Sequence, residues 1–139
     1  MTLENYGLTF HHLGLAVSDV PAALKVLRGL GFECGEEIHD PLQEVRLVWC
    51  QHATMPAVEL VAPTEAPGPI DNILEYSSEL IYHTCYEAAN IEESVSANKG
   101  DGIRVLPVAS PKPAVLFGGR RVGFYQLRGF GLIEIVEES

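Results

Sequence analysis

The sequence predicts an α+β fold built from two βαβββ modules, because the chain repeats its own pattern. YHTCYEAANIEE repeats HHLGLAVSDVPA, with His83 standing 71 positions after His12. GLIEIVEE repeats PAVELVAP, with Glu134 standing 75 positions after Glu59. Each copy reads as a strand, a helix and further strands, with a His in its first strand and a Glu in its last. The repeat therefore predicts two equivalent modules that each contribute one His and one Glu.

The length of 139 residues suits one domain with a substantial core, which we assign to residues 1–139. The repeat places the first module at about 8–62 and the second at about 79–137, and residues 63–78 form the linker. The composition, 47% apolar and 20% charged, is ordinary for a globular protein.

The charge and the cysteines narrow the class of function. Nine Lys and Arg against 19 Asp and Glu give a net charge of −10, which repels nucleic acids and anionic membranes. No apolar run of about 18 residues predicts a membrane span. The three cysteines are odd in number and form no CxxC pair, which favours reduced thiols and a cytoplasmic location.

The first module begins with LTFHHLGLAV, a strand in which His12 shares one face with small residues, as at the concave face of a site. Ser18-Asp19 then predicts the start of a helix, with an N-cap, that carries Pro21 in its first turn and ends at Gly31. FECGEEI and VRLVWCQ read as strands separated by the turn HDPLQ, and AVELVA is the last strand.

The linker APTEAPGP leads into PIDNILEYSS, which predicts a short helix. The second module has a strand in ELIYHTCYEA, a helix capped by Asn90 that closes at Lys99-Gly100, and strands in IRVLPV, RRVGFYQL and GLIEIVE. Residues 107–120, rich in Pro and Gly, are predicted to be a loop that holds the four extra residues of this copy. A lid over the substrate and a static connection are both open for this loop.

The two His and two Glu predict a metal site. A carboxylate among apolar strand residues, as in VELV, must be paired, neutralised or bound to a cation. Pairing of the two modules would direct His12, Glu59, His83 and Glu134 inward as a His2Glu2 set. Such a set suits one divalent ion of Zn, Fe, Co, Ni or Mn, and does not distinguish among them. His11 must point to the opposite face and is expected to be structural.

The four segments HHLGLAVSDV, VELVAP, YHTCYEA and LIEIVEE resemble the vicinal oxygen chelate superfamily, within it the branch of methylmalonyl-CoA epimerase and glyoxalase I. The resemblance covers about residues 10–137. It implies two βαβββ modules in an incomplete barrel, the glyoxalase/bleomycin resistance/dioxygenase fold, and it assigns the same four residues as ligands.

The resemblance implies a metal-dependent isomerase, epimerase or lyase that removes a proton next to a carbonyl group. We expect Glu134 to be the base and Glu59 its partner, since a carboxylate beside a metal-held carbonyl can take that proton. The alternatives are a metal-free binding protein of the drug-sequestering kind, and a thiol transferase or dioxygenase of the same superfamily. The acidic residue Glu59 argues against a thiol transferase and against a dioxygenase.

The expected partner is a small molecule, with a CoA thioester, another thioester, a hemithioacetal and a secondary metabolite all open. Four side chains are candidates for binding its polar or anionic tail on the face of the ligands, and these are Arg46, Cys50, Arg121 and Tyr125. No nucleic acid and no membrane is expected as a partner, and a homodimer is the assembly considered.

Overall fold

The structure is a computed structural model, and it describes residues 3–138. Over these residues the chain forms three α-helices and nine strands, and the prediction of an α+β fold is confirmed. The chain divides into two compact units, which are described separately below. One unit runs from His12 to Tyr82, and the other combines the residues before His12 with those from His83 onward. None of the helices in the described part of the chain is long and apolar enough to cross a membrane.

The first unit contains the part of β1 from His12 onward, helix α1, four further strands and the short helix α2. Its strands follow the order β2-β4-β5-β1, and β3 also pairs with β4. β1 is parallel to β5, whereas β4 is antiparallel to β2, β3 and β5. The bounds are β1 (Thr9–Val17), α1 (Val20–Gly29), β2 (Glu33–Cys34), β3 (Ile38–Asp40), β4 (Val45–Gln51), β5 (Val58–Pro63) and α2 (Asp71–Tyr76).

The second unit repeats this plan with strand order β6-β9-β8-β7. β6, which enters this unit at His83, is parallel to β9, whereas β8 is antiparallel to both β9 and β7. The bounds are η1 (Glu4–Gly7), β6 (Glu79–Ala88), α3 (Ile91–Gly100), β7 (Val105–Pro113), η2 (Val115–Phe117), β8 (Arg121–Leu127) and β9 (Gly131–Glu137).

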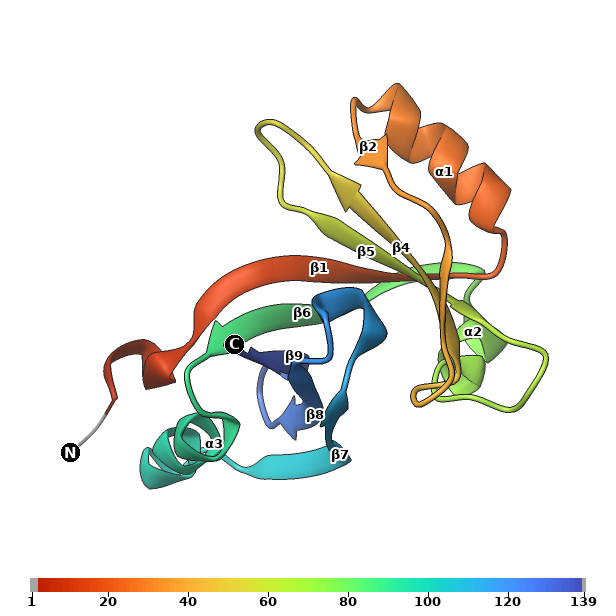
Figure 1. Cartoon of the computed structure of the whole chain (residues 1–139). Coiled ribbons are helices and arrows are strands. Elements are labelled where there is room, and N and C mark those ends of the chain that lie inside the picture. The colour runs from red at the N-terminus through yellow and green to blue at the C-terminus, as the bar shows by residue number, and fades with distance from the viewer. Residues whose placement is uncertain (1–2, 139) are drawn as a thin grey trace. The chain divides into compact units, whose positions relative to one another are not determined.

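Both long helices begin at the predicted caps. The Asp19 carboxylate accepts a hydrogen bond from the Ala22 amide at 3.0 Å, and the Asn90 side-chain oxygen accepts one from the Glu93 amide at 2.9 Å. These bonds satisfy amides that have no partner within the first turn of a helix. In Figure 1, α1 lies beside β2 and α3 lies beside β7. The helices therefore start at the positions that the two sequence copies share.

Each helix covers a hydrophobic core on one face of its own strands. Val20 and Leu27 of α1 pack with Val48 and Cys50 of β4 and with neighbouring residues of β5. The corresponding core of the second unit contains Ile91 of α3 with residues of β8 and β9, namely Tyr125, Leu127, Ile133 and Ile135. Because side chains alternate along a strand, the residues between these core positions point to the other face of the strands.

Two predicted segments differ from the structure. The strand predicted in FECGEEI is interrupted, so that β2 and β3 pair separately with β4. The first half of the predicted loop 107–120 is strand, because β7 continues to Pro113, and η2 follows it. The register between β7 and β8 shifts on either side of Ala109, which accommodates extra residues in a paired strand. Prolines are tolerated there because β7 ends the order of strands, and an edge strand does not need every N–H donor.

The turn between β3 and β4 is fixed by a buried carboxylate. Asp40 accepts hydrogen bonds from the Leu42 and Gln43 amides at 3.0 and 3.2 Å, and from the Gln43 side-chain amide at 2.9 Å. Asp40 thereby compensates the cost of its own burial. The predicted turn HDPLQ is confirmed, and its closure sets where β4 begins.

An arginine joins β8 to the start of α3 and the end of β9. Arg121 donates to Glu92 at 2.5 Å and to both carboxylate oxygens of Glu137 at 3.2 Å, and Glu137 accepts a further bond from the Ile91 amide at 3.1 Å. The hydrogen bond from Arg121 is the main reason that the pKa of Glu92 lies below its ordinary value of 4.5. A depressed carboxyl pKa contributes stability that is present above the unfolded pKa and is lost as the pH falls through the folded pKa.

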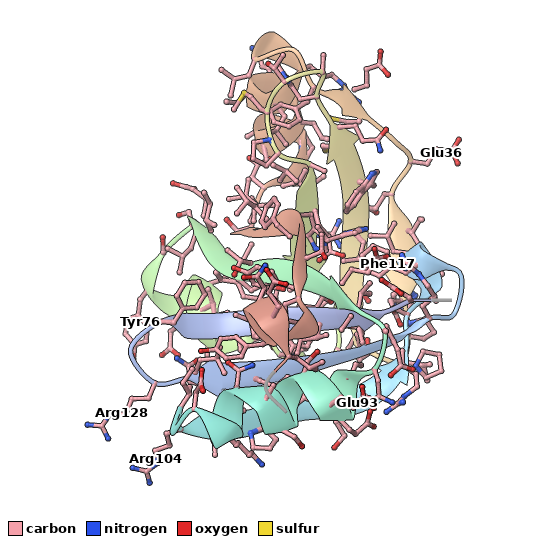
Figure 2. The ribbon with its side chains drawn as sticks, turned by 90° about the vertical axis from the view of Figure 1, so that its left-hand side faces the viewer. Glu36, Tyr76, Glu93, Arg104, Phe117 and Arg128 are labelled. Carbon is pink, nitrogen blue, oxygen red and sulfur yellow. The ribbon has the colours of Figure 1, made fainter. Side chains whose placement is uncertain are left out.

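We therefore expect Glu92→Gln to lower the melting temperature at pH 7. The difference from wild type should shrink as the pH falls below the ordinary pKa of 4.5 and through the lower pKa of the folded state, where the wild-type carboxylate also becomes protonated. Glu93→Gln is the matched control, since Glu93 lies in the same helical turn (Figure 2) and its carboxylate forms no ion pair within residues 3–138. Thermal unfolding monitored by circular dichroism from pH 7 to pH 3 measures both variants. An equal pH dependence for the two variants would contradict the role of the Arg121 pair.

Candidate functional site

A cluster of three residues, the first cluster, lies on the face of the first unit opposite to the core under α1. His12 of β1 and Glu59 of β5 are both buried, and His12 Nε2 lies 3.6 Å from Glu59 Oε1. The parallel pairing of these strands places Gly14 opposite Glu59, so that His12 and Glu59 share a face. Trp49 of β4 is directly opposite Glu59 on the other side, and its ring packs against His12 at 5.1 Å between centroids with an interplanar angle of 80°.

The second unit contains the same arrangement, the second cluster. His83 of β6 and Glu134 of β9 are buried, with 3.3 Å between His83 Nε2 and Glu134 Oε1. Cys85 stands opposite Glu134 in the parallel pair, and Phe124 of β8 stands opposite it on the other side. The Phe124 ring packs against His83 at 5.3 Å with an interplanar angle of 81°.

The two clusters are equivalent in position as well as in composition. Both His12 and His83 stand five residues before the end of their strands. In both clusters the glutamate pairs with the residue two places after the His. The tertiary structure of each unit therefore reproduces the correspondence of His with His and Glu with Glu that the sequence repeat predicts.

The distances within each cluster suit shared coordination of an ion. Two ligand atoms at about 2.0–2.2 Å from one ion, at a tetrahedral angle, are separated by about 3.3–3.6 Å. The measured His–Glu separations of 3.3 and 3.6 Å fall in this range, and they exceed the length of about 2.7–2.9 Å that is typical of a charge-assisted hydrogen bond. The donor set of imidazole nitrogen and carboxylate oxygen therefore fits a divalent transition metal in geometry and in chemistry.

Two candidate substrate-binding residues lie in the hydrophobic cores and do not share the face of the glutamates. Cys50 belongs to the core under α1, and Tyr125 belongs to the core beside α3. Each follows an aromatic residue of a cluster by one position, so alternation along the strand directs it away from that cluster. Burial is the main reason that the pKa of the Cys50 thiol rises to about 12, and burial likewise raises the pKa of Tyr125.

The two candidate arginines also lie on the faces opposite to the clusters. Arg46 donates to the Pro63 carbonyl at 2.8 Å and to Glu37 at 3.1 Å, and these residues line an open depression of about 920 Å³. Arg121 is held by Glu92 and Glu137. The prediction that the four candidates share the face of the predicted metal ligands is therefore wrong. In β4 and β8 the aromatic residues Trp49 and Phe124 lie on the face of the clusters, and the four candidates lie on the other face.

Two neighbours of the predicted ligands, His11 and Cys85, pack against apolar side chains. His11 packs against Phe117, labelled in Figure 2, with 5.5 Å between ring centroids. Cys85 is buried in a small hydrophobic cluster with Val122, Val136 and other residues of the second unit. Both residues therefore have packing roles.

The sequence contained an unused signal for the two aromatic residues. Trp49 and Phe124 are separated by 75 positions, the same offset that relates Glu59 to Glu134. Gln51 and Gln126 follow at the same offset. In each strand the glutamine stands two places after the aromatic residue, on the same face. The repeat therefore extends from the predicted ligands to the residues around them.

The chain's class is now defined: it is an α+β protein that carries one buried His–Glu–aromatic cluster in each of two similar units. Residues 11–124 match the family model of the glyoxalase/bleomycin resistance protein/dioxygenase superfamily, and the chain belongs to this superfamily. This is the family that the sequence resemblance indicated. No curated sequence matches the chain.

Solved structures share the fold at low sequence identity. Methylmalonyl-CoA epimerase from Mycobacterium tuberculosis is 20% identical, with a TM-score of 0.79 over 99% of this chain and 93% of that one. A hypothetical protein from Bacillus halodurans is 22% identical, with a TM-score of 0.78 over 95% of each chain. A Streptomyces coelicolor methylmalonyl-CoA epimerase variant bound to 2-nitronate-propionyl-CoA is 24% identical, with a TM-score of 0.73 over 95% of this chain and 99% of that one.

Proposed function

We propose that the protein is a metal-dependent enzyme that removes a proton next to a carbonyl group of a small substrate, as an epimerase or isomerase or as a lyase of the glyoxalase I kind. The observation that carries this proposal is the equivalence of the two buried His–Glu pairs. One buried carboxylate beside an imidazole has many explanations, but two at matching strand positions indicate one shared use. Membership of the superfamily supports the same function.

The proposed ligands of one divalent ion are His12 and Glu59 from the first cluster and His83 and Glu134 from the second. In support, the atom separations within each cluster suit ligation, and all four side chains are buried. A divalent ion bound by them would polarise a substrate carbonyl and lower the energy of the enolate that forms when the adjacent proton leaves. Zn, Co, Ni, Mn and Fe remain the candidate ions.

Glu134 is the proposed base, and Glu59 is its counterpart in the first unit. A Glu134 carboxylate oxygen would take the proton from the carbon next to the carbonyl. Return of the proton to the opposite face of that carbon is epimerisation, and return to the neighbouring carbon is isomerisation. Two carboxylates in equivalent positions suit epimerisation, because one can remove the proton while the other supplies one from the opposite face.

The proposed substrate class is an acyl-CoA or related thioester. Support comes from similar structures that are methylmalonyl-CoA epimerases, one of them in complex with methylmalonyl-CoA. A hemithioacetal is the second candidate, because it presents the same acidic C–H beside a carbonyl. A cytoplasmic location and a homodimer complete the proposal.

Purified protein should contain close to one divalent ion per chain, and His83→Ala should lose most of it. Four ligands hold the ion in this proposal, and removal of one imidazole leaves three. Elemental analysis after dialysis measures the content, and the melting temperature with and without a chelator reports the coupling of metal to folding. His11→Ala is the matched control, because His11 is adjacent to His12 but packs against Phe117. Wild-type metal content in His83→Ala would place the ion elsewhere.

Wild type loaded with metal should exchange the proton next to the carbonyl of a suitable thioester or ketone for solvent deuterium. Glu134→Gln should reduce this exchange by about 10²-fold or more, because the amide cannot accept the proton. Proton NMR of the substrate in deuterium oxide measures the exchange even where net turnover is slow. Because Glu134 is also a proposed ligand, the metal content of the variant is measured first.

The companion variant Glu59→Gln separates the two carboxylates. If metal-loaded Glu134→Gln exchanges at the wild-type rate and Glu59→Gln does not, Glu59 is the base. If metal-loaded wild type exchanges nothing across a broad thioester, hemithioacetal and ketone panel, the protein binds small molecules without this chemistry.

A further inference from the structure

We propose that Trp49 and Phe124 are positioning residues, which hold the His12 and His83 imidazoles in the orientation that metal ligation needs. This inference rests on the proposed function. Each aromatic ring meets its imidazole nearly at right angles, with interplanar angles of 80° and 81° and centroid distances of 5.1 and 5.3 Å. Edge-to-face packing of this kind is favourable, and it restricts rotation of both rings.

Each aromatic residue also lies beside the glutamate of its own cluster. Trp49 is directly opposite Glu59, and Phe124 is directly opposite Glu134. Each ring therefore stands next to the carboxylate as well as against the imidazole. A metal ligand must keep its ring nitrogen aimed within a narrow range, and neighbouring groups that fix this aim are worth about 10–100-fold in metal affinity or activity.

The two units have different aromatic residues at equivalent positions. The first unit uses Trp and the second uses Phe at the same place, so an aromatic ring, and not the indole N–H, is the shared requirement. Trp49→Phe should therefore preserve metal binding, whereas Trp49→Leu and Phe124→Leu should weaken it. Since the chain contains a single Trp, Trp49 is also the fluorescent reporter for the first cluster in every variant that retains it.

The experiment measures Co²⁺ affinity by competition with a chelator, together with the visible absorption bands of bound Co²⁺. We expect a dissociation constant about 10–100-fold higher in Trp49→Leu and Phe124→Leu, with altered bands, and near wild-type values in Trp49→Phe. Val48→Ala in β4 and Leu127→Ala in β8 are the matched controls. These two residues belong to the same strands as Trp49 and Phe124, but they lie in the hydrophobic cores on the opposite face. The controls should lower the melting temperature without changing the absorption bands.

The outcomes separate this inference from the proposed function. If wild type binds no Co²⁺, the proposed metal site itself is wrong. If wild type binds Co²⁺ and both leucine variants bind it with the same affinity and bands, the metal site stands and the positioning role is overturned. If the core controls change the bands as much as the leucine variants do, the effect is general destabilisation and the positioning role is again overturned.

A different observation carries a second proposal, which does not depend on the metal. We propose that Cys34 and Cys50 form a reversible disulfide when the protein meets a peroxide. Cys34 of β2 is directly opposite Cys50 of β4 in an antiparallel pair. The Gly35 amide donates to the Trp49 carbonyl at 2.9 Å, so Gly35 and Trp49 form a hydrogen-bonded pair. Because the two kinds of pair alternate along antiparallel strands, Cys34 and Cys50 form a non-hydrogen-bonded pair. Cα atoms of such a pair are about 4.5 Å apart, inside the range of about 4.4–6.8 Å that disulfides require.

The surroundings of the two thiols assign their roles. Cys50 is fully buried in the core under α1, and Cys34 is half-buried at the edge of the same core. Cys34 is therefore the sulfur that meets hydrogen peroxide: its S–O bond forms as the O–O bond breaks, giving a sulfenic acid and one water. The Cys50 sulfur then attacks the Cys34 sulfur, the S–S bond forms and a second water leaves. In total, two thiols are oxidised and one peroxide is reduced to two waters.

Treatment of the whole protein with hydrogen peroxide should lower its mass by 2 Da and reduce its free thiols from three to one, with full reversal by dithiothreitol. In Cys34→Ser, peroxide treatment should no longer lower the mass by 2 Da or consume free thiols in this way. The control Cys85→Ser should still lose 2 Da, because Cys85 lies in the other unit. Peptide mapping identifies the linked pair. Accumulation of sulfinic acid at Cys34 with Cys50 still reduced would overturn the proposal, and so would a disulfide between two chains in place of the internal one.

Discussion

The parallel pairing of the first and last strands in each unit is the constraint on which the rest depends. With β1 beside β5, Glu59 stands opposite Gly14, and with β6 beside β9, Glu134 stands opposite Cys85. Because side chains alternate with a period of two, this register brings each glutamate to the face of its histidine. A slip of one residue would turn Glu59 into the core and Leu60 out of it, so burial of the apolar residues enforces the alignment of the polar ones.

The two faces of the central strands have different roles: one packs in a hydrophobic core, and the other carries the residues of the cluster. In β4, Val48 and Cys50 pack beneath α1, whereas Trp49 contacts His12. The helix caps and the closed turn at Asp40 fix the ends of the elements, and the cores fix their registers. Buried His–Glu pairs are costly on their own account, since desolvated carboxylates need a compensating charge. Well-packed cores on the opposite face let the protein tolerate these pairs, and a bound cation would add a positive charge beside the carboxylates.

Similarity to known epimerases concerns the fold more than the lining of the site. Identities of 20–24% accompany TM-scores of 0.79 and 0.73 for the epimerases of Mycobacterium and Streptomyces. Backbone pairing is preserved by any sequence that keeps alternation and caps, whereas substrate choice depends on individual side chains around the ligands. In this chain the surroundings are unequal, with Trp in one unit and Phe in the other. Small and apolar residues, among them Gly14 and Cys85, complete the two faces.

The sequence by itself determined the α+β class and the repeat, because alternation, caps at Ser18-Asp19 and Asn90, and matched spacings of His and Glu are local or periodic signals. The resemblance of four segments to a known superfamily indicated the family. Only the tertiary structure decided which residues of β4 and β8 face the clusters and which face the cores. VRLVWCQ has apolar residues on both faces, so its pattern does not say whether Trp49 or Cys50 faces the glutamate. Pairing with β5 decides it, and this long-range register moved Cys50 and Tyr125 into the cores and brought Trp49 and Phe124 to the clusters. The same limit applies to residues 107–120, where Pro and Gly indicated a loop, and pairing along β8 with bulges made its first half, up to Pro113, part of an edge strand.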